Sequence, residues 1–510
     1  VLVFLIISGI IVIIPVSGAT ETENTWVTKA PMHQARCGLG IIAVGGEVYA
    51  IGGTTSADSF IEDVMGTTEQ YDPTTDVWVY KTSMPTPRAF FAVASYQNKI
   101  YCMGGAVGMK LLDERSGFYS IIDSNKVEVY DTLKDTWATK VSMPKSGGID
   151  ISAQEINGKI YVTGNTYILV YDPVNDSWID TGSTPMPRYS AVIDNKIIAT
   201  NVHDVLLPPT SPYYGGSYPA QQVVIYDPEN NSLTQGKDGQ IGVGGTAVGA
   251  TTGMKAPKRV YVLGITSQKV PHASVNQAYD LMTNNWTEAA PMPTLRTDFG
   301  VAVVNDTLYA IGGLLISYTY DSTGKYIQFS QATPTNINEQ YIPLGYGTIH
   351  PEIRILSPQN KVYNSSIVIL DFYVDKPFLE LSYSLDSKQN VTITRNFTIV
   401  NLSNGFHNVT LYASDTFGNV GASQTVSFAI DKGEAFPTLT VVAVSVVLVL
   451  LMIFGWFWST YGNANEGKRM SKNAALMIVL IFLVLIVTSI FCVTPAKAQF
   501  GSIQHLPQIT

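Results

Sequence analysis

Four arginines stand in the same local context, close after a turn that contains Pro-Met, Met-Pro or Pro-x-Pro. A guanidinium group carries a planar fork of N–H donors that suits carboxylates. Placed near one another, such arginines would bind carboxylates, acidic sugars or acidic peptides. The alternative is that each arginine ties down the backbone of its neighbouring loop. The four candidates are Arg36, Arg88, Arg188 and Arg296.

Tyrosines in long, turn-rich segments form a second set of candidates. Exposed tyrosines beside Gly and Pro suit sugar stacking or protein contact. The alternative is that they pack against their own loops. The candidates are Tyr119 in segment 106–126 and Tyr213, Tyr214 and Tyr218 in segment 203–222; a third long segment covers 314–337.

The other reactive residues form no catalytic or metal-binding pattern. No Ser/His/Asp set, phosphate-binding loop or zinc spacing is present. We expect no metal and no cofactor, and we expect Cys37 and Cys102 to be small buried apolar residues. A net charge of −9 argues against nucleic acid as the main partner. The scattered residues are His33, His203 and His272, with Cys37, Cys102 and Cys492, which form no CxxC pair.

A three-part repeat supplies the elements that position these residues. Its first part is a strand that ends in glycine, as in "GEVYAIGG" and "DTLYAIGG". Its second part is a strand that ends in a turn such as "YDPTTD", and its third part carries a tryptophan, as in "VWVYKTSMPTPR". Asp-Pro-x-x-Asp is a tight-turn sequence, and paired glycines permit a sharp exit from a strand.

These parts resemble the kelch repeat, with Gly-Gly, then Tyr, then Trp at fixed offsets. The resemblance covers Asn24 to about Gly347 and implies an all-β fold, a six-bladed β-propeller over residues 24–347. The last copy lacks its Trp strand, and "TWVTKAPM" near the start supplies one. We therefore predict that the Trp26 strand closes the ring by pairing near Tyr341, so that no sheet edge is left open.

Strand direction sorts the loops of such a propeller into two faces. Connections from the second to the third strand of a blade share one face with connections from one blade to the next. The three long segments and the four arginines belong to that face, which is therefore the expected ligand-binding face. We expect it to point away from the cell.

Two enzyme types also resemble this repeat. Kelch-type galactose oxidases hold copper with two His and two Tyr, one of them cross-linked to Cys, and the scattered histidines here do not fit that set. Six-bladed kelch epimerases acting on sialic acid need an acid–base group beside channel arginines. Asp113, Glu114 and Asp204 are candidates by location. Our first interpretation is nevertheless a protein that is not an enzyme.

Residues 348–431 show about seven short alternating strands with turn signals at Asn404-Gly405 and Gly418-Asn419. They predict an immunoglobulin-like β-sandwich, without the Cys pair of antibody domains. The segment resembles sandwich modules found beside propellers on prokaryotic, especially archaeal, cell surfaces. Its expected role is a stalk between the propeller and the membrane.

Three apolar segments predict export and a membrane anchor. Residues 1–19 fit a truncated signal peptide, the alternative being an anchor. Residues 438–458 carry no charge and as a helix span roughly 31 Å, which matches a bilayer core. The basic residues that follow predict that this end is cytoplasmic. Residues 474–494 are a second hydrophobic helix or part of a fused segment that resembles a signal peptide.

Nine Asn-X-Ser/Thr sites agree with export. Together these features predict a protein of the cell membrane with the bulk of its chain extracellular, which binds a glycan or protein ligand through propeller loops. The alternatives are a sugar-active enzyme at the channel and a structural component of the cell envelope. The glycosylation candidates are Asn175, Asn230, Asn285, Asn305, Asn364, Asn390, Asn396, Asn401 and Asn408.

Overall fold

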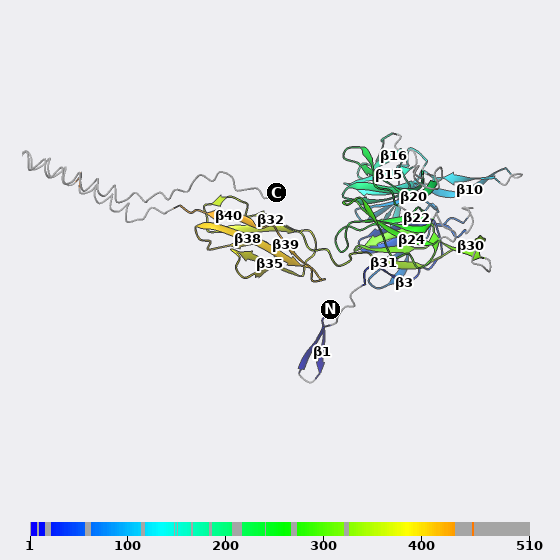
Figure 1. Ribbon diagram of the computed structural model, residues 1–510. Helices are drawn as coiled ribbons and strands as arrows, with labels where there is room; N and C mark the ends of the chain where they lie inside the picture. The colour runs from blue at the N-terminus through cyan, green and yellow to red at the C-terminus, as the bar shows by residue number, and fades with distance from the viewer. Residues whose placement is uncertain are drawn as a thin grey trace, which may run out of the picture. The chain divides into compact units, whose positions relative to one another are not determined.

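A computed structural model of the chain divides into two compact units (Figure 1). The first unit comprises Val1–Glu352, Val374–Leu379 and Ala413–Gly421, and the second comprises the rest. The structure describes residues 2–7, 10–15, 22–56, 63–113, 118–146, 148–149, 151–164, 167–182, 186–206, 217–239, 241–266, 273–320, 326–433 and 451–452. Over these ranges the regular elements are β-strands.

Six four-stranded antiparallel sheets make up most of the described part of the first unit. The first three are β4 (Gly40–Val44), β5 (Glu47–Ile51), β6 (Thr68–Asp72) and β7 (Val77–Lys81); β8 (Ala92–Tyr96), β9 (Lys99–Met103), β12 (Val127–Asp131) and β13 (Thr136–Lys140); and β14 (Ile151–Ile156), β15 (Lys159–Gly164), β16 (Tyr167–Asp172) and β17 (Ser177–Asp180).

The other three sheets repeat the same strand order. They are β18 (Tyr189–Ile193), β19 (Lys196–Leu206), β20 (Ser217–Asp227) and β21 (Ser232–Gln235); β22 (Val243–Ala250), β23 (Val260–Thr266), β24 (Ser274–Asp280) and β25 (Asn285–Glu288); and β27 (Gly300–Val304), β28 (Thr307–Ile311), β31 (Asn338–Ile342) and β3 (Thr25–Lys29).

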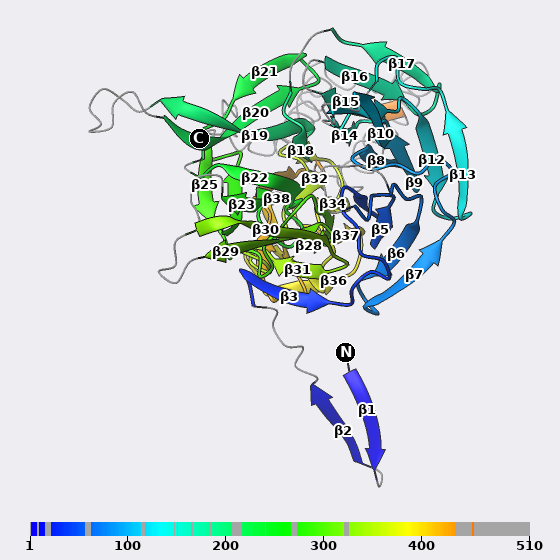
Figure 2. The same cartoon turned by 90° about the vertical axis from the view of Figure 1, so that its right-hand side faces the viewer.

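The first strands of the six sheets contact one another in a closed ring, in the order β4, β8, β14, β18, β22, β27 and back to β4. Figure 2 shows the sheets arranged around this ring, with the fourth strands at the periphery. Apolar side chains of adjacent sheets fill the space between them, as where Val48, Tyr71 and Trp78 meet Tyr309. The predicted all-β, propeller-type fold is confirmed at this level.

The N-terminal strand closes the ring as predicted. β3 pairs with β31 in antiparallel register, with Trp26 opposite Tyr341. Asn24 lies at the seam, where its Oδ1 accepts hydrogen bonds from the Tyr341 hydroxyl at 2.8 Å and from the Ala290 N–H at 2.7 Å. The Trp26 Nε1 donates to the Ala290 carbonyl at 2.8 Å.

The seam reproduces a bonding pattern found elsewhere in the ring. In the first sheet the Tyr71 hydroxyl donates to Asp76 at 2.6 Å, and Trp78 Nε1 donates to the Ala30 carbonyl at 2.8 Å. Asp76 also accepts from the Ala30 N–H. Each turn carboxylate or amide therefore ties its own strand to the neighbouring sheet, which explains why Tyr, Asp or Asn, and Trp recur together.

Hairpins extend three of the sheets where the long segments were predicted. β10 (Ala106–Asp113) and β11 (Phe118–Asp123) form a two-stranded sheet, and β19 pairs with β20 along ten positions. β29 (Leu314–Tyr320) and β30 (Tyr326–Pro334) form a three-stranded sheet with β26 (Arg296–Thr297). All three hairpins connect second to third strands and so share a face; Figure 1 shows β10 and β30 on the same side.

Nine strands follow the propeller and form two further sheets. The three-stranded sheet is β32 (Ile353–Ser357), β34 (Val368–Val374) and β37 (Phe397–Ile399). The six-stranded sheet is β33 (Val362–Tyr363), β40 (Val426–Ile430), β38 (Gly405–Ser414), β35 (Glu380–Leu385), β36 (Val391–Ile393) and β39 (Val420–Ala422). β33 pairs with β40 in parallel, so this sheet is mixed.

The terminal segments add one further pair of strands. β1 (Leu2–Ile7) and β2 (Ile10–Pro15) form an antiparallel hairpin in which Leu2 lies opposite Pro15. Apart from residues 451–452, the predicted membrane helix 438–458 and the hydrophobic segment 474–494 lie outside the described residues. Where the structure is described, no helix has the length and apolar character needed to cross a bilayer.

Candidate functional site

Three of the four predicted arginines are fully buried inside the sheets. Arg36, Arg88 and Arg296 have side chains that are 0% exposed. In Arg88, Nη1 donates to the carbonyls of Gly104 and Lys126 at 3.0 and 2.9 Å, and Nη2 donates to Glu128 at 2.9 Å. The carbonyl of Gly104 is available because that residue turns the chain in the left-handed region, at φ +67°.

The same clamp occurs in the first and sixth sheets. Arg36 donates to the Gly52 carbonyl at 2.8 Å and to Glu69 at 2.9 Å. Arg296 donates to the Gly312 carbonyl at 2.9 Å and to Glu339 at 2.7 Å. Burial lowers the pKa of the Arg36 guanidinium, while the charge of Glu69 opposes that shift.

Each glutamate also fixes the loop that leads into the first strand of its sheet. Thr86 donates its hydroxyl to Glu128 at 2.8 Å, and Thr294 donates to Glu339 at 2.5 Å. In the first sheet, the backbone N–H of His33 donates to Glu69 at 2.8 Å. These contacts match the alternative in which the arginines tie down neighbouring backbone. A guanidinium with no exposed surface cannot touch a ligand, so we leave these three out of the ligand surface.

Arg188 lies in a different place, because it stands one residue before β18, whereas the three buried arginines stand four residues before the first strands of their sheets. The fourth sheet also lacks the glutamate of the clamp. In the third strand, two residues before the tyrosine that recurs in each sheet, it has Val224 where the clamped sheets have Glu69, Glu128 and Glu339. Arg188 is half-buried and lines a central pocket, where its guanidinium carbon lies 4.5 Å from the centre of the Tyr189 ring. Of the four arginines predicted to bind a ligand, only Arg188 therefore remains a candidate.

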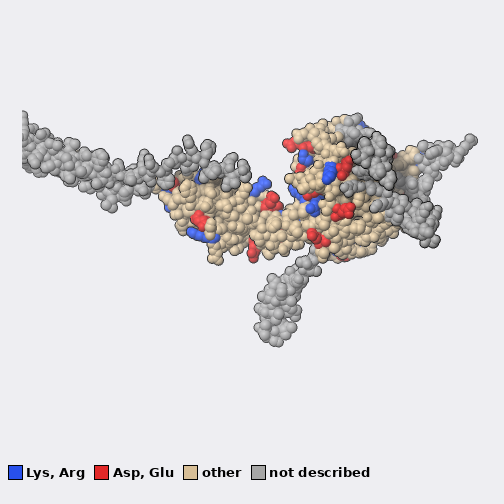
Figure 3. Space-filling model, viewed as in Figure 1, with Lys and Arg blue, Asp and Glu red and all other residues tan. Residues whose placement is uncertain are grey.

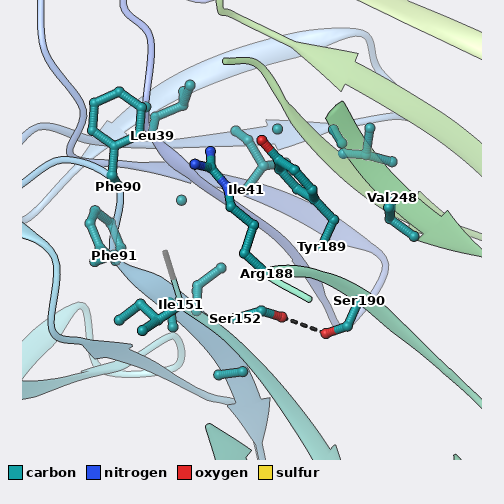
Figure 4. A pocket seen from close by; sticks show the side chains of 18 of the residues that line it. Leu39, Ile41, Phe90, Phe91, Ile151, Ser152, Arg188, Tyr189, Ser190 and Val248 are labelled. Carbon is teal, nitrogen blue, oxygen red and sulfur yellow. Dashed lines mark hydrogen bonds between the residues drawn. The ribbon is translucent and has the colours of Figure 1, made fainter. Parts of the chain in front are cut away.

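The central pocket lies where the first strands of all six sheets begin. It has a volume of about 210 Å³. Figure 4 shows Arg188 and Tyr189 side by side among apolar side chains of other sheets, including Leu39, Phe90 and Ile151. A cation and an aromatic ring in an apolar cavity suit a ligand that has both a carboxylate and an apolar or ring-shaped body.

Polar groups occupy one wall of this pocket. The hydroxyls of Ser152 and Ser190 are 2.5 Å apart, and Gln154 Nε2 donates to the Ser190 carbonyl at 2.8 Å. Asp298 lies on the same pocket; burial raises the pKa of its carboxyl, and the positive charge of Arg188 partly offsets that shift. The pocket therefore holds a cation, a carboxyl group and hydroxyl groups within one cavity.

Strained backbone positions mark the rim of the pocket. Gly38, Phe90 and Asp298 are equivalent residues of three sheets, and their φ angles of +60°, +54° and +52° lie in the left-handed region. The Gly38 N–H donates to the Asp298 carbonyl at 2.9 Å, and the Phe90 N–H donates to the Gly38 carbonyl at 2.7 Å. Such conformations cost about 1–2 kcal/mol for residues with a Cβ and cluster at functional sites.

Two of the hairpins adjoin this rim. Ala89 pairs with Ala106 at the base of β10, and Met109 and Ile121 of that hairpin pack in one cluster with Phe90. β26, which ends one residue before Asp298, pairs with β29. The pocket and these two hairpins therefore form one continuous candidate surface on one face.

The predicted tyrosines of this face are described only in part. Tyr119 lies in β11 opposite Leu111, and Tyr218 lies in β20 opposite Val205. Their side chains, and all of Tyr213 and Tyr214, lie outside the described residues. A ligand-binding role for these four tyrosines stays a prediction.

The acid–base candidates chosen by location do not join the pocket where they are described. Asp204 is exposed on β19 and does not line the pocket. Glu114 and the side chain of Asp113 lie outside the described residues. Asp298, which the sequence analysis did not select, takes the place next to Arg188. The spacing from the preceding methionine would have singled out Arg188, because it follows Met186 by two residues whereas the buried arginines follow theirs by four. Nothing in the sequence alone indicated Asp298.

The two described cysteines lie away from ligand access. Cys37 and Cys102 are buried free thiols, as predicted, and burial raises the pKa of each to about 12. Within the described residues, no group of three or more His, Cys, Asp or Glu side chains is placed to hold a metal ion. Figure 3 shows acidic and basic side chains interspersed over the visible described surface.

The glycosylation candidates all have described asparagines, and all nine are exposed. Asn175, Asn230 and Asn285 lie at turns between third and fourth strands, and Asn305 lies at the turn between β27 and β28. The remaining five belong to the strands and loops that follow the propeller.

Comparison with known proteins identifies kelch repeats in the chain. The Kelch motif matches residues 35–85 and 87–144, which contain the first two sheets. Kelch-like protein 35 of Mus musculus is 27% identical over 179 residues, covering 34% of this chain and 28% of that protein. Beta-scruin of Limulus polyphemus is 26% identical over 186 residues, covering 34% and 19%.

The chain is also similar to a third protein over a shorter stretch and to one solved structure. Influenza virus NS1A-binding protein homolog of Xenopus laevis is 39% identical over 79 residues, covering 16% of this chain and 12% of that protein. The chain thus spans 28% or less of the length of these relatives. The structure titled "Structure of YjhT" has 14% identity and a TM-score of 0.39, covering 60% of this chain and 96% of that chain.

Proposed function

We propose that this chain is an extracellular recognition protein of the cell membrane, which binds a protein or glycan ligand on one face of a kelch propeller. Its proposed parts are a signal peptide at 1–19, a six-bladed propeller at 24–347, an immunoglobulin-like sandwich at 348–431 that acts as a stalk, a membrane helix at 438–458 and a hydrophobic segment at 474–494.

The observation that carries this proposal is the central pocket beside the hairpins. Arg188 and Tyr189 line it, three strained residues of adjacent sheets lie on its rim, and the bases of two hairpins adjoin it. Hairpins on one face provide contact area for a large ligand, while the pocket accepts one of its side chains or sugar units.

A protein ligand and a glycan ligand are each favoured by a different observation. The kelch-repeat relatives include one named for binding a viral protein, which favours a protein ligand. The Tyr189 ring, the Arg188 guanidinium and the paired serine hydroxyls favour a sugar that carries a carboxylate.

The test uses the full chain reconstituted in lipid nanodiscs, applied to glycan and protein arrays. We expect saturable binding that Arg188→Ala weakens by about 10- to 100-fold, because a hydrogen bond to a charged group contributes about 1.5–3 kcal/mol. Lys134→Ala, which removes an exposed cation 75% accessible to solvent on the opposite face, is the matched control and should leave binding unchanged. Equal loss in both variants would contradict the proposal.

A second candidate function is a sugar-active enzyme at the same pocket. The observation that favours it is that Arg188 and Asp298 line one cavity, where burial raises the pKa of the Asp298 carboxyl and a carboxyl group could exchange protons with a bound sugar. Incubation of array-positive sugars with the protein, followed by NMR, distinguishes the two. Conversion that Asp298→Asn abolishes would indicate an enzyme, and binding without conversion would indicate recognition.

A further inference from the structure

We infer that N-linked glycans coat the propeller face opposite the central pocket, on an arc formed by the third, fourth and fifth sheets. This inference rests on the proposed extracellular location. The sites are Asn175, Asn230 and Asn285, with Asn305 as a weaker fourth site. The ligand face, with its pocket and hairpins, is then the face without glycans.

Strand direction places these asparagines at one end of the sheets. Asn175 lies between β16 and β17, Asn230 lies between β20 and β21, and Asn285 is the first residue of β25. Each therefore sits where a third strand turns into a fourth. In an antiparallel four-stranded sheet, this end is opposite to the end where the first strand begins and the hairpins emerge. The pocket residues Gly40, Ile151 and Tyr189 are at those beginnings.

The three turns are also neighbours around the ring. β14 contacts β18, and β18 contacts β22, so their sheets are consecutive. Figure 2 shows the fourth strands β17, β21 and β25 along the periphery. Glycans at these turns would cover a continuous arc of the rim, rather than isolated points on both faces.

The local geometry is compatible with modification. Asn175, Asn230 and Asn285 are exposed, and so are the hydroxyl residues of their motifs, Ser177, Ser232 and Thr287. Asn175 Nδ2 donates to Asp172 at 2.6 Å. Since this nitrogen carries two hydrogens, one can be replaced while the other keeps that bond.

Asn305 differs in the accessibility of its motif. Its hydroxyl residue, Thr307, is 4% exposed and donates to the Val304 carbonyl at 2.7 Å. A transferase that reads the motif in the folded protein would find this hydroxyl already bonded. We therefore expect lower occupancy at Asn305 than at the three other sites.

The covalent step requires a lipid-linked oligosaccharide phosphate as donor. The asparagine amide nitrogen attacks the anomeric carbon of the first sugar and loses one proton. A carbon–nitrogen bond forms, the carbon–oxygen bond to the phosphate breaks, and the lipid phosphate leaves. No group is oxidised or reduced.

Turn chemistry is the competing explanation for these asparagines. Asn is common at turns, and the neighbouring turn residues Asp76, Asp176 and Asn284 adopt left-handed φ angles of +58°, +49° and +53°. That explanation accounts for asparagine in the turn, but it does not require a hydroxyl two residues later. In the first sheet, the position equivalent to Ser177 is Val77.

The test is glycopeptide mass spectrometry on the full chain purified from the membranes of its natural host. We expect glycan on Asn175, Asn230 and Asn285, lost at one site only by Ser177→Ala, Ser232→Ala or Thr287→Ala. These changes leave each turn asparagine in place, and Ser177→Thr is the matched control that should keep the glycan.

The same experiment distinguishes failure of the glycan-coated face from failure of the proposed extracellular location. Glycan on sites such as Asn390 and Asn408 with none on the three propeller sites would overturn the coated face, while the proposed extracellular location would stand. A chain without glycan at any of the nine sites would overturn both. Glycan confined to Asn305 within the propeller would also overturn the arc.

Discussion

At the scale of single residues, the arginine pairs separate structural from functional positions. Arg36, Arg88 and Arg296 each pair with a buried glutamate and the carbonyl of a turning glycine. Arg188 stands one residue before the first strand of its sheet, whereas the other three stand four residues before theirs, and it lines the pocket. A displacement of three positions along the repeat thus coincides with the difference between a buried, paired arginine and one that lines a cavity.

Breaking one buried pair should strongly destabilise the propeller. Arg88→Ala leaves Glu128 charged and buried, and we expect a loss of about 3–5 kcal/mol in the free energy of unfolding. Arg88→Met combined with Glu128→Leu removes both charges and should recover much of that loss, as the third sheet has Leu169 at the glutamate position. Calorimetric unfolding of the full chain measures the stability of the single and the double variant. A double variant as unstable as Arg88→Ala alone would contradict the stabilising role assigned to the Arg88–Glu128 pair.

The buried carboxyl of Asp298 should make the stability of the folded protein depend on pH. Because burial raises its pKa in the folded protein, the folded state binds a proton more tightly than the unfolded state, and stability falls as pH rises through the folded pKa. Asp298→Asn should therefore raise the melting temperature at neutral pH, and the difference should vanish below about pH 4, the unfolded pKa. An Asn variant that is less stable at neutral pH would contradict this prediction, because the attraction of Arg188 would then outweigh the effect of burial.

At the scale of elements, the repeat made most of the ring predictable. Gly-Gly exits, Tyr-Asp turns and Trp strands recur with fixed order, so the pairing of Trp26 with Tyr341 followed from counting them. The role of Asn24 was not predicted, since one asparagine before a strand has no signal until its partners are known. The extra pairing of β26 with β29 was also missed, because a two-residue strand has no periodicity.

The seam gives a prediction for β3. Asn24→Ala leaves the Tyr341 hydroxyl and the Ala290 N–H without their acceptor, and we expect a loss of about 1–3 kcal/mol in the free energy of unfolding. Val27→Ala, in the strand that follows Asn24 and with a side chain 42% exposed, is the matched control and should change the free energy of unfolding by less than about 0.5 kcal/mol. Urea unfolding followed by tryptophan fluorescence measures both, and equal effects would contradict the closing role of Asn24.

At the scale of the whole molecule, the two propeller faces differ in what they carry. One face carries the pocket and three hairpins, and the other carries the four propeller sequons. Strand order in the sequence was sufficient to sort these loops, but the pocket itself required coordinates, since it combines residues from all six first strands.

Hydrogen–deuterium exchange of the full chain, with and without the strongest ligand found on the arrays, tests this assignment most directly. The account predicts slower exchange in the bound state at Tyr189–Ile193 and at Ala106–Asp113, which lie at the pocket and its neighbouring hairpin. Protection confined to the turns around Asn175, Asn230 and Asn285 would contradict it, because the ligand would then occupy the face assigned to glycans.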